Sequence, residues 1–530
     1  NNEHIQNMVI REEIQVMNFK ETNLKIYLVL LLIVPWLKGG NDKSSILYAV
    51  LICFLICILK SLSELKFRKT SSDLKFRLVF LFLLICCFSL FQSYLNITRL
   101  EDLHNDLKPR NLSLESERSA FFKILSDVKD SREVTLDNYL LLNTNNELHY
   151  KFSKLSNEAN KIIDNLFYLI SEKFVPYVPN IPFWNDSLFL DLAVLCIVLA
   201  SSVLLVANIN SIKYCKIISI FILLNCFILA FVGVLQKFNI LNFDLSKPLL
   251  GIWSVSDPRY YFSTFSYKNH WSGFVILCLF HGMAVLLSKN QLFRRNRKSY
   301  FRVFLIFLFL LPLATLFVIE SRLALFILFG SCVSLGLCFK FRLSLKISAL
   351  VLSVAMCLGF LLLPKESSVW DRTNSQIENL KQGKYPFRFL LWQDAVNQIQ
   401  DRSFWGYGIG SYKIINPIFQ SSETVHERYV VTENAHRSFT PIIKSTHNDL
   451  LQFIIEHGFI SCCLILFPVF FVSLREFIYA KSNYLRIIAA GCLMYLLHSF
   501  LDLPNSSFAN LILFSTTFAI ILACRRIRMS

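Results

Sequence analysis

The segment STHNDLLQFIIEHG, residues 445–458, places ionisable side chains at the start of a long apolar stretch. Asp449, Gln452 and Glu456 recur at helical spacing, so a helix would carry them as one polar stripe. If Asp449 caps that helix, Gln452 can reach back to it. His447 lies just outside, and an imidazole, whose ordinary pKa is about 6.5, can act as a general base. Ionisable groups at membrane depth usually face a cavity, so the stripe predicts a water-filled cavity with His447 at its mouth.

A second polar segment, PFRFLLWQDAVNQIQDRSFWGYGIGSY, covers residues 386–412. Arg388, Trp392 and Ala395 are spaced to share one face of a short helix. Glycines then alternate with larger residues from Gly406 to Gly410, which predicts a tight turn where the backbone closely approaches another part of the chain. This G-x-G-x-G pattern lacks the strand and helix context of a nucleotide-binding loop.

The elements that must position these residues are membrane helices. The 530 residues are 54% hydrophobic and only 17% charged, which is typical of a polytopic membrane protein. We predict an all-α protein with about twelve transmembrane helices and two long extracytoplasmic segments. The predicted spans are 22–38, 44–59, 77–92, 187–209, 216–236, 269–287, 303–319, 322–339, 347–364, 449–473, 485–503 and 505–523.

Basic residues fix the predicted orientation, because short cytoplasmic loops are rich in Lys and Arg. Basic clusters follow the second, sixth and eighth spans, and another lies in the C-terminal tail. All four fall on one side, so both termini are predicted to be cytoplasmic. The net charge of +17 is spread over short loops, whereas a nucleic-acid-binding protein gathers such charge on one folded face. Nucleic acid is therefore excluded as a partner.

The predicted organisation has five parts. Residues 1–92 hold an N-terminal tail and three spans, 93–186 form an outer insertion, and 187–364 hold spans four to nine; 365–448 form a second outer segment, and 449–530 hold the last three spans and a tail. The insertion contains an amphipathic helix pattern, which fits either a structural cap or a helix in the membrane interface. Neither outer segment contains cysteine, so no disulfide framework is expected there.

Five motifs follow one another over roughly residues 255–475, and all fall on the predicted outer side. They are RYYFSTFSYKNHWSGF from Arg259, ESRLALF from Glu320, FRFLLWQDA from Phe387, WGYGIGSY from Trp405 and HNDLLQFIIEHG from His447. Together and in this order they resemble the O-antigen ligase and polymerase superfamily of bacterial membrane glycosyltransferases.

The resemblance implies a glycosyltransferase in the bacterial inner membrane with a periplasmic active site. Such an enzyme moves a glycan from an undecaprenyl diphosphate carrier to an acceptor hydroxyl, here that of lipid A core. His447 is then the expected base. Arg322 and Arg388 are the expected diphosphate ligands, because a guanidinium can bind two phosphate oxygens at once. No metal or other cofactor is expected, since His447, Asp449 and Glu456 lack clean metal-ligand spacing.

Further residues are expected to line or support the substrate site. They are Lys268, Asn269, Trp392, Asn448, Asp449 and Glu456. Glu456 is expected to orient its neighbours, because it lies one or two helical turns below His447. His426 and His436 belong to no motif and are expected to be solvated.

Each assignment has a structural alternative. His447 can be a helix-capping histidine at the interface, and Arg322 a snorkelling arginine at a span end. Arg388 can form a weak surface ion pair with Asp394 or Asp401. Lys268 and Asn269, together with His270, can simply begin a helix.

Alternative functions share the same motifs. A polysaccharide polymerase would extend a glycan chain, and a protein O-oligosaccharyltransferase would modify protein hydroxyls. A non-enzymatic transporter of lipid-linked glycan would also need a cationic cavity, but transporters often carry inverted repeats, and no such repeat is visible in this sequence.

Overall fold

The computed structural model describes part of the chain. The described residues are 28, 31–38, 198, 202, 209–240, 249–250, 252–253, 260–288, 298–337, 378, 381, 386–401, 403–421, 423–424, 430–432, 437–439 and 443–529. The predicted spans 44–59, 77–92 and 347–364 and the insertion 93–186 lie outside them, as does most of spans 22–38 and 187–209.

The chain divides into two compact units, which we describe separately. The bundle unit comprises Asn1–Cys87, Phe189–Ser375 and Cys463–Ser530, and the loop unit comprises Phe88–Leu188 and Gln376–Cys462. The boundary at 462/463 falls within one long helix, α17 (Asp449–Tyr479).

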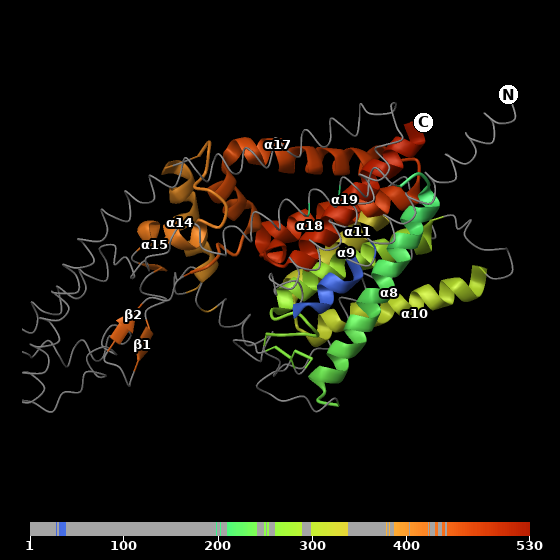
Figure 1. The fold of residues 1–530 in the computed structure, drawn as a ribbon, viewed down its shortest axis with the longest axis horizontal. Helices are drawn as coiled ribbons and strands as arrows, with labels where there is room; N and C mark the ends of the chain where they lie inside the picture. The colour runs from blue at the N-terminus through green and yellow to red at the C-terminus, as the bar shows by residue number, and fades with distance from the viewer. Residues whose placement is uncertain are drawn as a thin grey trace, which may run out of the picture. The chain divides into compact units, whose positions relative to one another are not determined.

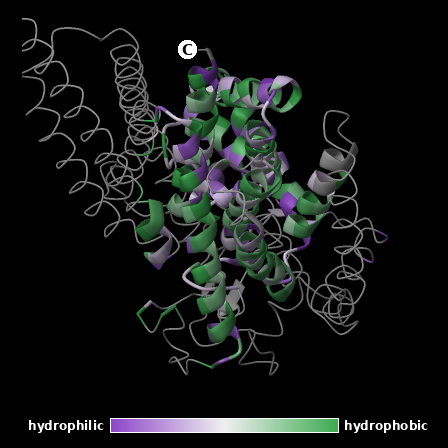
Figure 2. Ribbon diagram, turned by 90° about the vertical axis from the view of Figure 1, so that its right-hand side faces the viewer, coloured by the Kyte–Doolittle hydropathy of each residue, from purple (hydrophilic) through white to green (hydrophobic). Residues whose placement is uncertain are grey.

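The bundle unit is built from apolar helices around a central one (Figure 1). Its helices are α8 (Ile212–Lys237), α9 (Lys268–Leu287), α10 (Lys298–Val318), α11 (Arg322–Leu337), α18 (Asn483–Leu501), α19 (Phe508–Met529) and the second part of α17, with short 3-10 turns η1 (Val34–Trp36) and η5 (Pro504–Ser506). α9 packs against α8, α10, α18 and α19 and is the most buried of the long apolar helices. Hydrophobic residues predominate along these helices (Figure 2).

Six helices among the described residues are long and apolar enough to cross a membrane. They are Ile212–Lys237, Lys268–Leu287, Tyr300–Val318, Asp449–Tyr479, Asn483–Leu501 and Phe508–Arg528. Each coincides with a predicted span, and α11 occupies the predicted span 322–339. The mostly helical membrane class is therefore confirmed for the described residues, while the total of twelve spans and the periplasmic assignment of the outer segments stay predictions.

The loop unit contains α14 (Phe387–Asp401), α15 (Tyr412–Phe419) and the start of α17. Side chains from all three meet in a small apolar core that includes Leu391, Tyr412 and Ile455. This unit also holds a short antiparallel hairpin, which the sequence analysis did not predict. Its strands β1 (Val430–Thr432) and β2 (Arg437–Phe439) pair Val431 with Ser438 at their centre.

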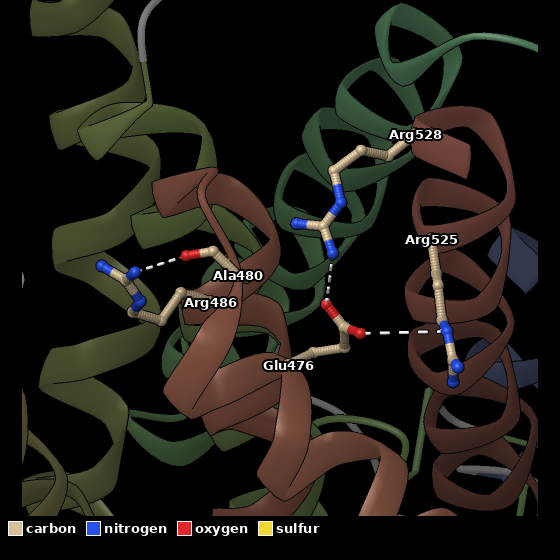
Figure 3. Close-up of polar contacts among 5 residues, drawn as sticks. All are labelled: Glu476, Ala480, Arg486, Arg525 and Arg528. Atoms are coloured by element: carbon tan, nitrogen blue, oxygen red, sulfur yellow. Dashed lines mark hydrogen bonds and ion pairs between the residues drawn. The ribbon is translucent and has the colours of Figure 1, made fainter. Parts of the chain in front are cut away.

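A buried carboxylate joins α17 to α19 inside the bundle unit (Figure 3). Glu476 is only 2% exposed, and its oxygens lie 3.3 Å from Arg528 and 4.0 Å from Arg525. Arg486 on α18 donates to the carbonyl of Ala480 just after α17. The arginines at the end of α19 were predicted from sequence to set topology, and two of them also compensate this buried charge.

Candidate functional site

The glycine-rich turn at residues 403–410 binds the first part of α17 through backbone hydrogen bonds. The amides of Tyr407 and Gly408 donate to the carbonyls of Ile455 and Glu456, each at 2.8 Å. In the opposite direction, the Phe459 amide donates to the Ser403 carbonyl at 2.8 Å, and Ile460 to Phe404 at 3.4 Å. Together these four bonds form what we call the backbone clasp, and it lies wholly within the loop unit.

The clasp compensates a break in α17. Gly458 has φ 76° and ψ 168°, which is not helical, so nearby backbone groups lose their ordinary partners. The turn supplies donors and acceptors to those groups. The predicted close approach of the glycine turn to another segment is thus observed, and the other segment is the H-N-D…E-x-G motif.

Two glycines are required where the segments meet. A Cβ on Gly406 would lie 2.5 Å from the Gly458 nitrogen and 2.8 Å from the Glu456 carbonyl carbon. Both glycines also have positive φ, which other residues adopt only at a cost. One contact therefore explains Gly406 of the turn and Gly458 of α17.

The Glu456 carboxylate is held at both oxygens. The Gly410 amide donates to Oε2 at 3.0 Å, and Gln452 Nε2 donates to Oε1 at 3.1 Å. The side chain is 8% exposed. The two hydrogen bonds link the glycine turn to α17 through this carboxylate, and the orienting role of Glu456 stays a prediction.

The cap of α17 differs from the sequence prediction. Asn448, not Asp449, is the N-cap: its Oδ1 accepts from the amides of Leu450 and Leu451, both at 3.1 Å, and its carbonyl accepts from Gln452. Asp449 is the first helical residue, where a negative charge favours the helix dipole. The Gln452 side chain reaches forward to Glu456 rather than back to the cap.

His447 immediately precedes this cap and is half-buried. Its φ of 54° lies in the left-handed region, which is uncommon for a residue other than glycine. Such conformations persist where the surrounding structure imposes them, and they cluster at functional sites. Here the neighbouring cap is further fixed by Thr446, whose Oγ1 accepts from the Asn448 amide at 3.0 Å.

Arg388 and Trp392 lie one helical turn apart on α14, and both are half-buried. The Trp392 ring contacts Phe389, with ring centroids 5.3 Å apart. Asp401, one of the acids considered as an ion-pair partner of Arg388, accepts a hydrogen bond from the Tyr407 hydroxyl.

Asp394, the other acid considered, is fully buried. It accepts from the Thr424 hydroxyl at 2.7 Å and from the Ser421 amide at 3.1 Å. Burial raises the pKa of this carboxyl, and these hydrogen bonds offset part of the shift. Burial also raises the pKa of Tyr412, with a contribution from the nearby carboxylates of Asp394 and Glu456. These contacts make Asp394 a structural acid inside the loop unit.

The remaining predicted residues belong to the bundle unit. Lys268 begins α9 and donates from Nζ to the Ile319 carbonyl at 3.3 Å, in the turn between α10 and α11. Arg322, half-buried, is the first residue of α11 just beyond that turn. In the same turn Glu320 has a positive φ of 53°. The structure therefore brings the start of α9 to the turn that carries Arg322.

Asp502 is a polar partner that the sequence reasoning missed. It is 1% exposed, and its Oδ2 accepts from Asn269 Nδ2 at 2.6 Å. Asn269 also donates to the Tyr267 hydroxyl at 2.9 Å. An acid inside the predicted span 485–503 was the available signal, since ionisable residues in spans are expensive.

The predicted site residues thus form two groups. Lys268, Asn269 and Arg322 lie in the bundle unit, whereas Arg388, Trp392, His447, Asn448, Asp449 and Glu456 lie in the loop unit. Their joint action in one site stays a prediction. Among the described residues, no group of three or more His, Cys, Asp or Glu side chains is arranged to hold a metal ion, and metal independence also stays a prediction.

Comparison with known proteins identifies the domain that contains most of these residues. Residues 307–466 match the family model described as O-antigen ligase. The match includes Arg322, Arg388, the glycine turn and the start of α17, and it excludes Lys268 and Asn269. No curated protein gives a significant match. The resemblance predicted from the five motifs is confirmed over residues 307–466, which are similar to O-antigen ligases. This match implies a bacterial membrane enzyme of the glycosyltransferase or ligase type.

Proposed function

We propose that this O-antigen ligase domain transfers a glycan from undecaprenyl diphosphate to a hydroxyl of lipid A core on the periplasmic face of the inner membrane. The observation that carries the proposal is the backbone clasp. It joins two motifs that are distant in sequence, and one of them carries His447 next to a helix cap.

His447 acts as the general base in this proposal. Its imidazole accepts the proton of the acceptor hydroxyl while the hydroxyl oxygen bonds to the anomeric carbon of the glycan. The bond from that carbon to the diphosphate oxygen breaks, and its electron pair leaves with undecaprenyl diphosphate. The left-handed backbone at His447, held by Thr446 and Asn448, supports a fixed side-chain position for this step.

The arginines stabilise the leaving diphosphate. Arg388 on α14 and Arg322 at the start of α11 are half-buried, and partial burial strengthens charge-assisted hydrogen bonds to phosphate. Lys268 supplies a further positive charge near the turn that carries Arg322.

The other proposed residues position substrate or structure. Trp392 offers an aromatic face one turn from Arg388, suited to stacking on a sugar ring. Asn269 lies at the start of α9 next to Lys268. Asn448, Asp449 and Glu456 fix the start of α17 and the glycine turn.

The decisive experiment compares His447→Ala with His436→Ala, a histidine in the same outer segment that belongs to no motif. Membrane vesicles containing each variant are given an undecaprenyl diphosphate-linked glycan and lipid A core, and the transferred glycan is quantified. Loss of a general base is expected to reduce transfer by about 10²- to 10⁴-fold, whereas His436→Ala should retain it. Full transfer by a stably expressed His447→Ala protein would refute the base assignment.

The acceptor is tested by the glycan phenotype of a deletion. Loss of all glycan-capped lipopolysaccharide supports ligation to lipid A core. Products limited to a single repeat unit would instead identify a polymerase, and loss of glycosylated protein would identify an oligosaccharyltransferase. Movement of the donor across the membrane without any transfer would overturn the enzymatic proposal.

A further inference from the structure

α17 consists of two helical segments that meet at Gly458, whose φ and ψ are not helical. The longer segment runs from there to Tyr479 and carries the apolar stretch of this helix. The run from Gly458 to Leu474 contains no Asp, Glu, Lys, Arg or His and would be about 25 Å long. Asp449, Glu456 and His457 precede this run, and Arg475 follows it. The sequence of α17 therefore places one membrane boundary close to Gly458.

Exposed aromatic side chains lie next to Gly458. Phe404 is 63% exposed, Trp405 48% and Phe459 46%. They are held together by the backbone clasp, since the Phe459 amide donates to Ser403 and the backbone of Phe404 and Trp405 lies against Gly458. Large apolar side chains exposed next to one another mark an interaction surface.

The part of α17 that belongs to the bundle unit also exposes large apolar side chains. Phe467 and Phe471 lie about one helical turn apart and are 43% and 60% exposed. Among the six candidate spans, α17 has the smallest buried share. A helix of this composition with an exposed aromatic and aliphatic face is suited to contact with lipid chains.

We propose that Phe404, Trp405 and Phe459 form an aromatic anchor in the headgroup and glycerol zone of the bilayer. Tryptophan favours this zone because its ring is apolar and its indole N–H can bind polar groups. The partner is the phospholipid interface itself, and this contact does not depend on the proposed transfer reaction.

The anchor sets the height of the candidate site. Glu456 lies within one turn of Gly458, and its carboxylate is bound to the Gly410 amide of the anchored turn. His447 precedes Gly458 in sequence, on the polar side of the break. The polar stripe of α17 is thus assigned to the zone above the hydrocarbon core, not to its interior.

Fluorescence quenching tests the anchor directly. The full-length protein and its Trp405→Phe variant are placed in phosphatidylcholine vesicles, and the Trp405 signal is taken as the difference between them. Vesicles contain lipids with a spin label either near the headgroup or near the chain end, and iodide is added to the water in a separate series. The variant is conservative, and Trp405 is half exposed, so the fold should survive.

The expected result is strong quenching of the Trp405 signal by the shallow label, weaker quenching by the deep label and little by iodide. Strong iodide quenching without lipid quenching would overturn the proposal, because Trp405 would then lie in water. Stronger quenching by the deep label would overturn the interfacial placement. Trp271 is fully buried in the bundle unit, so the difference signal from Trp271→Phe should be insensitive to iodide and serves as the control. Because no step requires glycan transfer, failure of this test is distinguishable from failure of the proposed function.

Discussion

Replacing Gly406 with alanine should open the backbone clasp. The new Cβ would lie 2.5 Å from the Gly458 nitrogen and 2.8 Å from the Glu456 carbonyl carbon and oxygen, and these backbone atoms cannot rotate away as a flexible side chain could. The turn must therefore move, and the bonds from Tyr407 and Gly408 to α17 are the first to be lost.

The expected loss of stability of the clasp in Gly406→Ala has two contributions. Holding alanine in the left-handed region costs about 1–2 kcal/mol, and each lost hydrogen bond costs about 1 kcal/mol. With two bonds lost, the clasp should weaken by about 3–4 kcal/mol, which corresponds to an increase of about 150- to 1,000-fold in its opening equilibrium. Hydrogen exchange at the Tyr407 and Gly408 amides, followed by mass spectrometry in detergent, measures this opening.

Two further variants sharpen this test. Gly330→Ala is the matched control, because among the described residues no atom outside the local helix backbone lies within 4 Å of a Cβ built at that position of α11, and exchange in the clasp should not change. Gly406→Asn lowers the cost of the left-handed backbone but keeps the Cβ contact. If Gly406→Ala left exchange at Tyr407 and Gly408 unchanged, the contact between the two motifs would not be the reason for the glycine.

Three other predictions concern different parts of the chain. Asn448→Ala removes the cap of α17 and should lower the free energy of unfolding by about 1 kcal/mol, whereas Asn448→Asp keeps a capping oxygen. The alanine variant should therefore unfold at a lower temperature than the aspartate variant, and equal melting temperatures would contradict the cap. Asp502→Ala removes the acceptor 2.6 Å from Asn269 and should cost about 1–3 kcal/mol, with a smaller loss of thermal stability for Asp502→Asn. Cys215 and Cys524 have sulfur atoms 3.6 Å apart on α8 and α19; mild oxidation should link them in a disulfide detectable by peptide mapping, and its absence under conditions that oxidise other thiols would argue against this packing.

The existence of the helices was predictable because apolar composition and length determine which segments can cross a membrane. Their ends were less predictable. The span 216–236 was predicted to start near Lys216, yet α8 starts at Ile212, where the Ser211 side chain accepts from the Lys213 amide. Lys216 is accommodated inside the helix, with its ammonium group 6.0 Å from the centre of the Tyr484 ring. Hydropathy averaged over a window of sequence does not predict such a contact between two helices.

The candidate site was predictable as a set of motifs but not as an arrangement. Local spacing placed Arg388 and Trp392 on one helix face, and α14 bears this out. The choice between Asn448 and Asp449 as cap could not be made, since both residue types cap helices well. The clasp itself depends on backbone groups from segments distant in sequence, and no local pattern encodes such a pairing.

The buried Glu476 has a consequence for how the membrane domain is made. α17 is synthesised before α19, so Glu476 reaches the membrane before Arg525 and Arg528 exist to compensate it. An uncompensated buried carboxylate is costly, and the nascent helix must keep this group near the lipid headgroups until α19 arrives. Packing of α19 against α17 is then favoured by the attraction between its arginines and the carboxylate of Glu476. A chain ending before Arg525 would keep Glu476 in α17 without either of these arginine partners.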